Sequence, residues 1–207
     1  MTEGHVYVAA SGFGLRVIPK SAPYRYALSA APTGLDVERN DGRSWLFARL
    51  IPDGGGYTSQ VADNTPTLAD VLDVVEGPSW DRWWLDTSVY QVPLPAGWIA
   101  ASANGPSFFD LVGPSNALMF VQTPARLGTL SDVRTPDQQV VSTGADADSE
   151  WVDLSYRHNE RPWLQRHHLR RLGRVNLVVT AQAPVEAMPA TIGTQAELVR
   201  AARVRGA

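Results

Sequence analysis

The chain has 207 residues, a formal net charge of −3 and a hydrophobic content of 44%, values typical of a folded domain rather than of a disordered chain. It contains no cysteine, which excludes disulfides, thiolate zinc sites, iron–sulfur clusters and cysteine nucleophiles. The acidic balance gives no general attraction to nucleic acid or to an anionic membrane.

The length and the distribution of apolar residues limit the number of domains and the cellular location that we expect. A chain of this length suits one large domain, or two small ones that share a sheet. Residues 1–5 lack the positively charged start and the long apolar run of a secretory signal. No stretch approaches the roughly 18 uninterrupted apolar residues that a membrane-spanning helix needs. We expect a cytoplasmic, bacterial protein.

Residues 1–87 predict a β-rich half with one helix. Alternating apolar residues predict strands within 5–18 and 24–29, and Asn40-Asp41-Gly42 predicts a hairpin between two further strands. Thr65 as the cap, Pro66 in the first turn and four apolar residues at helical spacing predict a helix over residues 65–76. We expect this half to belong to the same domain as the remainder.

Three tryptophans follow the predicted helix, at Trp80, Trp83 and Trp84. Indoles gathered in so short a stretch would mark a surface for a partner or a ligand. The alternative is that they fill the core beneath a loop, because aromatic side chains dominate protein cores. Asp81 and Asp86 lie beside them and resemble the parts of a sugar site. The sequence leaves these alternatives open.

Proline and glycine divide residues 88–150 into short pieces. Residues 98–102, 107–112 and 117–122 predict the strands of a meander, and residues 129–134 predict one helical turn. The polar and acidic residues 136–150 predict a mobile loop.

Residues 150–207 predict three strands and a helix. The strands are expected at 152–157, 163–172 and 175–181, although the middle one alternates poorly. Thr194 and Glu197 match a capping box, in which a threonine and a glutamate satisfy the first helical amides, and so they predict the start of the helix.

Two segments carry a family resemblance. Leu94-Pro95-Ala96-Gly97-Trp98 precedes the meander, and Thr180-Ala181-Gln182-Ala183-Pro184 ends the last strand before the helix. Over about residues 88–204 this order resembles the PsbP-like family of α/β sandwich domains. The resemblance implies an α/β (α+β) fold: a mainly antiparallel sheet flanked by helices, with the strands of residues 1–87 added.

The resemblance also implies a role. Members of the PsbP-like family include photosystem accessory proteins, a nuclear-transport cofactor and bacterial envelope lipoproteins. They act as adaptors or accessory proteins, usually without catalysis. The matching positions in this chain are structural, so the family assigns no functional residue here.

The densest polar cluster is Arg166, His167, His168, Arg170 and Arg171. Adjacent histidines on a strand point to opposite faces, so His167 and His168 cannot hold one metal together. One interpretation has the arginines paired with the acidic residues at 146–153. Another is an anion site of His167, His168 and Arg171. A metal site of His158, His167 and Asp153 is a weaker alternative, and we predict no metal.

Motifs of catalysis are absent from the sequence. There is no Gly-x-Ser-x-Gly, no His-Glu-x-x-His and no Walker loop, and we predict no cofactor. Residues 157–174 are basic, with Tyr156 and Trp163 nearby as rings on which bases could stack. The acidic balance of the whole chain argues against nucleic acid as the partner.

These patterns favour a non-enzymatic accessory protein that binds another protein. The partner-binding candidates are Trp80, Trp83, Trp84, Arg166, Arg170 and Arg171. One alternative is a small-molecule-binding protein, or a hydrolase with an unrecognised site, which requires a concave pocket. A second alternative is a structural subunit or homo-oligomer whose amino-terminal strands offer sheet edges to neighbouring chains.

Overall fold

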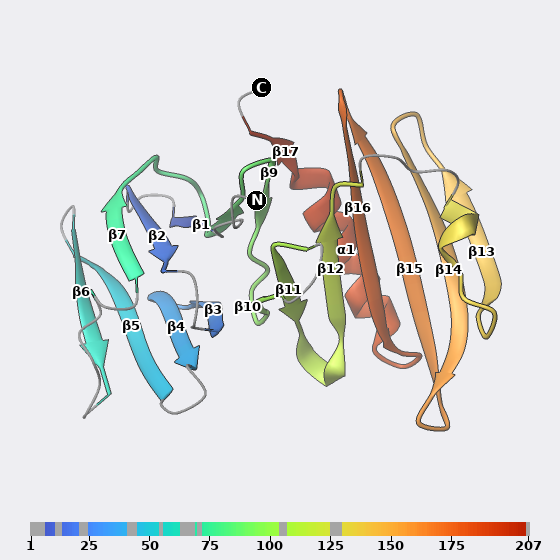
Figure 1. Ribbon diagram of the computed structural model, residues 1–207, viewed down its shortest axis with the longest axis horizontal. Helices are drawn as coiled ribbons and strands as arrows, with labels where there is room; N and C mark the ends of the chain where they lie inside the picture. Colours follow the sequence, from blue (N-terminus) through green and yellow to red (C-terminus); the bar gives the residue numbers. More distant parts are fainter. Residues whose placement is uncertain are drawn as a thin grey trace.

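The computed structural model describes residues 7–10, 14–20, 25–40, 45–53, 56–62, 69, 72–103, 107–124 and 130–205. Of these residues, 61% are in strands and 12% are helical. The strands form two antiparallel sheets, and one α-helix lies against them (Figure 1).

The larger sheet has eleven strands and draws on both halves of the chain. In spatial order they are β13 (Gln139–Ala145), β14 (Ser149–His158), β15 (Arg161–Leu172), β16 (Val175–Pro184), β12 (Leu118–Gln122), β11 (Phe109–Val112), β10 (Ile99–Ser102), β3 (Arg25–Ala31), β4 (Gly34–Asn40), β5 (Trp45–Asp53) and β6 (Gly56–Val61). The junction between the halves is the pair β10–β3, in which Ala100 lies opposite Leu28.

The smaller sheet has six strands and closes over part of the larger one. In order they are β17 (Arg203–Val204), β9 (Tyr90–Pro93), β8 (Trp84–Asp86), β1 (Tyr7–Ala10), β2 (Leu15–Pro19) and β7 (Leu72–Glu76). Two short 3-10 helices, η2 (Pro114–Asn116) and η3 (Leu130–Val133), lie in loops of the larger sheet. The helix α1 (Met188–Ala201) packs on β16, β15 and β9.

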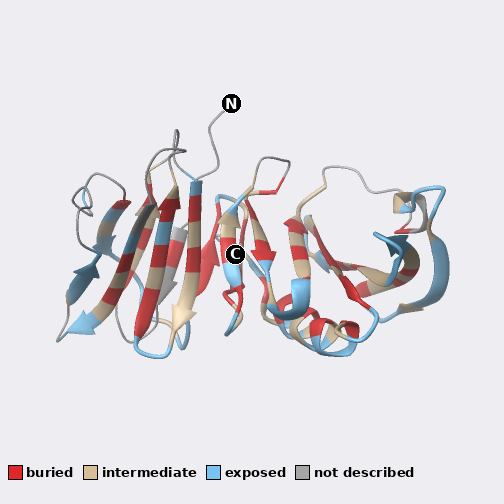
Figure 2. Cartoon of the chain, turned by 90° about the horizontal axis from the view of Figure 1, so that it is seen from below, coloured by how far each residue is buried: buried red, intermediate tan, exposed pale blue. Residues whose placement is uncertain are grey.

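The larger sheet has an inner face and an outer face. Every second side chain along the strands faces α1 and the smaller sheet. This inner core includes Leu28, Leu111 and Val179. A smaller apolar cluster lies on the opposite, outer face, where Leu130 of η3 covers Val152, Leu154, Leu169 and Val178. Figure 2 shows the resulting alternation as buried and exposed bands along the strands.

The expected α/β sandwich flanked by helices is wrong. Among the described residues α1 is the one α-helix, and the inner face of the larger sheet is covered by strands as well as by α1. The physical reason is that the amino-terminal half supplies strands rather than a second helix. Its apolar residues alternate with period two, as in the buried Leu15, Val17 and Pro19 of β2.

The predicted helix at 65–76 is wrong over its second half. Residues 72–76 form β7, in which Leu72 pairs with Pro19 of β2. Residues 65–68, 70 and 71 lie outside the described part of the chain. Leu72 and Val74 turn inward while Asp73, Val75 and Glu76 are exposed. Pairing with β2 therefore overrides a spacing that also fits a helix.

Two other boundaries differ from the sequence predictions. The expected loop at 136–150 contains the edge strand β13, which pairs with β14 through a bulge between Val140 and Ser142. Helix α1 begins at Met188 rather than at Thr194, because Pro189 in the first turn needs no amide partner. Thr194 instead donates to the carbonyl of Ala190 within the helix.

The strands β1 to β5, the meander β10 to β12 and the long strands β14 to β16 lie where they were predicted, as does the helical turn at 130–133, whereas β6, β8, β9 and β17 were not predicted. Within the described residues, no helix is long and apolar enough to cross a membrane.

Candidate partner-binding site at the β14–β15 hairpin

The tryptophans of the Trp80–Trp84 segment are mostly core. Trp83 is 9% exposed and donates its indole Nε1–H to the carbonyl of Gly34, 3.0 Å away. Trp84 is 4% exposed, and the guanidinium of Arg203 stacks 3.7 Å from its ring centroid. Only Trp80 is half-buried. Burial therefore leaves little of Trp83 or Trp84 for a partner to contact.

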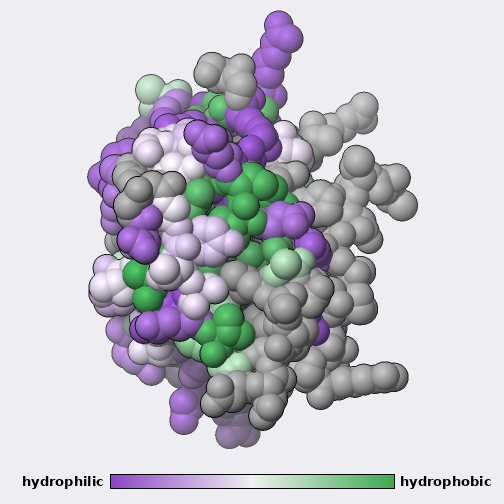
Figure 3. All heavy atoms as spheres, turned by 90° about the vertical axis from the view of Figure 1, so that its left-hand side faces the viewer, coloured by the Kyte–Doolittle hydropathy of each residue, from purple (hydrophilic) through white to green (hydrophobic). Residues whose placement is uncertain are grey.

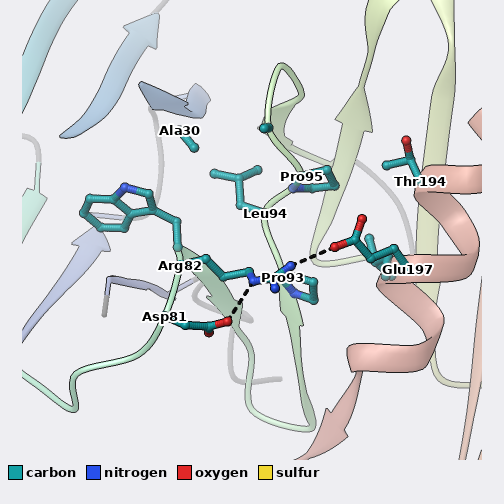
Figure 4. Close-up of a pocket in the computed structure, with 11 residues that line it drawn as sticks. Ala30, Asp81, Arg82, Pro93, Leu94, Pro95, Thr194 and Glu197 are labelled. Atoms are coloured by element: carbon teal, nitrogen blue, oxygen red, sulfur yellow. Dashed lines mark hydrogen bonds and ion pairs between the residues drawn. The ribbon is translucent and has the colours of Figure 1, made fainter. Parts of the chain in front are cut away.

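A pocket of about 490 Å³ lies beside this segment, between Trp83, Leu94 and α1 (Figure 4). The cationic side chain in its lining is Arg82, which bonds Asp81 at 3.2 Å and Glu197 at 2.9 Å, both of which also line the pocket. The close-up shows Arg82 reaching across the pocket toward the helix. Because both carboxylates already hold this guanidinium, we interpret it as a link to α1 rather than as an anion-binding group.

Three of the four arginines of β15 are paired with the acidic residues of β14 and its preceding turn. Arg166 makes a bidentate contact with Asp153, at 2.6 and 2.7 Å. Arg170 lies 3.5 Å from Asp148 and caps α1 by donating to the carbonyls of Val199 and Arg200. Arg171 pairs with Glu150 at 2.9 Å. The prediction that these cations close onto residues 146–153 is confirmed.

These pairs also fix protonation states. Burial raises the pKa of Asp153, but the hydrogen bonds from Arg166 and Ser142 outweigh it, so that the pKa lies below its usual range. Asp153 is therefore anionic at neutral pH, and its negative charge compensates the positive charge of Arg166. Arg166, Arg170 and Arg171 could serve a partner only by giving up these contacts.

The adjacent histidines face opposite ways, as predicted. His167 is buried on the outer face with its Nδ1 2.8 Å from Oγ1 of Thr180, and burial lowers its pKa to about 4. His168 lies on the inner face near Trp151, and burial and then Arg166 lower its pKa. The two therefore form no joint anion site with Arg171.

The same alternation of side chains between the two faces separates the residues of the alternative metal site, His158, His167 and Asp153. His167 lies on the outer face, whereas Asp153 pairs with Arg166 on the inner one. His158 is at the far end of β14. No cluster of three metal-ligating side chains occurs among the described residues.

A different set of side chains converges at the β14–β15 hairpin. Trp163 lies opposite Tyr156 on the outer face, with ring centroids 6.3 Å apart, and His158 stands edge-on to Trp163 at 5.4 Å. Trp163 and Tyr156 are half-buried and His158 is exposed. Unlike Trp83 and Trp84, these rings remain accessible in the described structure.

Trp163 lines two hollows at this end of the sheet. The first, of about 600 Å³, is lined by Val112, Asn116, Leu118, His158, Asn159, Arg161 and Trp163. The second, of about 520 Å³, is lined by Asp137, Gln139, Ser155, Tyr156, Arg157, Pro162, Trp163 and Val185. We call the two together the Trp163 groove. Its walls come from β11, β12, β13, β14 and β15, together with Asn116 of η2, Asn159 of the β14–β15 turn, Asp137 and Val185.

The two turns that border the first hollow are conformationally costly. Ser115 and Asn116 have φ of 56° and 63°, and Asn159 and Glu160 have φ of 50° and 64°. These are the non-glycine residues of positive φ among the described residues. Asparagine tolerates this region, whereas serine and glutamate do so less readily. Glycine, the usual residue for such a turn, is missing from both.

Replacing Glu160 with glycine is expected to stabilise the protein by about 1 kcal/mol, because glycine removes the Cβ clash of a left-handed residue. Urea unfolding of the wild type and of Glu160→Gly measures this change. Glu160→Ala keeps the Cβ and controls for loss of the carboxylate. An equal gain from Glu160→Ala would show that charge, rather than backbone strain, is responsible.

The other end of the larger sheet also exposes apolar side chains. In the described part of the sheet β6 is an edge strand, and Tyr57 and Val61 on it are 38% and 40% exposed. Val75 on β7 is exposed as well. Figure 3 shows apolar atoms gathered in the middle of the face at this end. The homo-oligomer alternative would depend on this surface.

Comparison with protein-family models, with curated proteins and with solved structures found no match for this chain.

Sequence reasoning found the parts of the Trp163 groove but did not assemble them. Tyr156 and Trp163 were noted as rings beside a basic segment. The missing step was the register: β14 and β15 pair so that Tyr156, His158, Arg161 and Trp163 share one face. The approach of the β11–β12 turn carrying Asn116 depends on strand order, which no local signal gives.

Proposed function

We propose that this chain is a non-enzymatic accessory protein that binds another protein through the Trp163 groove. The observation that carries this proposal is the accessible cluster of Tyr156, His158 and Trp163 beside two hollows. Accessible tryptophan, tyrosine and arginine are the residues that most often anchor protein partners.

The rigidity of the groove supports the same proposal. Trp163 lies within a twelve-residue strand that is paired on both sides, with Tyr156 on β14 and with Pro184 on β16. Its backbone is therefore ordered before a partner arrives, which reduces the entropy lost on binding. The cytoplasmic location expected from the sequence belongs to this proposal. The PsbP-like resemblance stays a prediction.

Replacing Trp163 with alanine is expected to abolish partner capture without unfolding the protein, because the ring is half-buried at the end of the sheet. The measurement is affinity capture from the native host, followed by mass spectrometry of proteins recovered stoichiometrically. Trp80→Ala is the matched control, since it removes another half-buried indole from the earlier candidate surface.

The result identifies the surface. Loss of one partner with Trp163→Ala, and its retention with Trp80→Ala, would support the groove. Loss with Trp80→Ala alone would move the site to the Trp80–Trp84 segment. Recovery of this chain alone with the wild-type bait would contradict the protein-binding proposal.

A further inference from the structure

The first hollow of the Trp163 groove carries one arginine, Arg161, whose charge no described carboxylate compensates. The guanidinium of Arg161 contacts no carboxylate among the described residues, and no acidic side chain lines this hollow. Farther along the same strand, Arg166, Arg170 and Arg171 are each held by an aspartate or a glutamate. The uncompensated charge of β15 is thus concentrated at the hairpin.

The same hollow has an apolar floor. Val112, Leu118 and Trp163 line it, and Val112 is 37% exposed. Asn116 and Asn159 contribute amide groups from the two turns. A ligand in this hollow therefore meets apolar surface, amide donors and acceptors, and a positive charge. This combination fits an apolar residue next to an acidic one on a peptide chain.

The second hollow differs in charge from the first, so the two parts of the groove are not equivalent for a charged ligand. Asp137 and Arg157 both line it. A hydrogen bond from Thr135 lowers the pKa of Asp137, so this carboxylate is anionic at neutral pH. The second guanidinium near the groove is already engaged, since Arg157 donates to the backbone carbonyl of Glu160. An acidic ligand group thus belongs in the first hollow, beside Arg161.

We propose that the Trp163 groove binds an extended, acidic segment of the partner protein, with a carboxylate at Arg161 and a neighbouring apolar side chain against Trp163. This rests on the proposed function and specifies its partner. The first hollow places Arg161 beside the apolar side chains of Val112, Leu118 and Trp163, which suits an acidic and an apolar side chain of an extended peptide. A nucleic acid fits less well, because its evenly spaced phosphates would meet Asp137 in the second hollow.

The test is fluorescence anisotropy with labelled decapeptides and the full chain. The first peptide carries one phenylalanine flanked by glutamates. The second has lysines in place of the glutamates, and the third has alanine in place of the phenylalanine. A single-stranded oligonucleotide of ten nucleotides is the fourth probe. We expect the first peptide to bind at least about tenfold more tightly than the others, with affinity that falls as salt rises.

Matched variants locate the binding. Arg161→Ala is expected to weaken the first peptide about tenfold, the loss of one charge-assisted hydrogen-bonded pair. Arg174→Ala removes an exposed arginine from the β15–β16 turn, at the other end of β15 from the hairpin. It is expected to leave the affinity for the first peptide unchanged. Equal losses from the two variants would overturn the proposal, because they would indicate a general charge effect.

The outcomes separate this inference from the function on which it rests. Preference for the lysine peptide or for the oligonucleotide would overturn the acidic-segment proposal. If no peptide binds but partner capture still requires Trp163, the acidic-segment proposal fails and the protein-binding function stands. If partner capture fails as well, both fail.

Discussion

Replacing Trp83 with alanine is expected to lower the free energy of unfolding by about 3–5 kcal/mol, the range for deleting a large aromatic side chain from a core. Trp83 is buried against the inner core, and its indole N–H is bonded to the carbonyl of Gly34. The measurement is urea unfolding followed by circular dichroism.

A graded control separates packing from hydrogen bonding. Trp83→Phe keeps most of the aromatic volume and loses the bond to Gly34, so a loss of about 1–3 kcal/mol is expected. Trp80→Ala removes a half-buried indole and should cost less than Trp83→Ala. If Trp83→Ala left stability unchanged but abolished partner capture, Trp83 would be a binding residue after all.

Acidification from pH 6.5 to pH 4 is expected to destabilise the protein by about 3 kcal/mol through His167 alone, since its pKa falls from 6.5 to about 4 on folding. Burial on the outer face keeps this ring neutral in the native state. Between the two pKa values the unfolded chain binds a proton that the folded chain does not. The contribution of His167 to stability is thus complete above pH 6.5, falls as the pH drops, and is lost below pH 4.

Two variants test this assignment. His167→Leu should flatten most of the fall between pH 6.5 and pH 4 in urea unfolding series. A smaller slope should remain, because burial also lowers the pKa of His168. His158→Gln, at an exposed histidine of the hairpin, is the control variant. A full slope in His167→Leu would show that another group controls the acid response.

Much of the fold followed from local patterns in the sequence. Period-two alternation located most strands, and the long strands β14 and β16 were clear because their apolar residues face one or two cores. The failures arose where two periods fit the same residues. Leu72 and Val75 suit a helix, but Val75 is exposed on a strand because β2 supplies a partner for β7.

The functional surface was harder to predict than the fold. Trp83 and Trp84 are conspicuous in the sequence, yet their neighbours in space, Gly34 and Arg203, are far away along the chain. Likewise, the pairing of Arg166 with Asp153 required the register of β14 against β15. Which rings and cations remain accessible is a property of the whole sheet, so local composition could not decide it.

Site-specific photo-crosslinking in the host is the most direct test of whether the Trp163 groove binds a partner protein. A photoreactive phenylalanine analogue at Val112 would sit at the first hollow, and the same analogue at Val75, on β7 of the smaller sheet, is the matched control. Both valines are exposed on strands. If the groove binds the partner, one partner protein is crosslinked from position 112, and this crosslink disappears in the Trp163→Ala variant. Crosslinking from position 75 alone, or unaffected by Trp163→Ala, would contradict it.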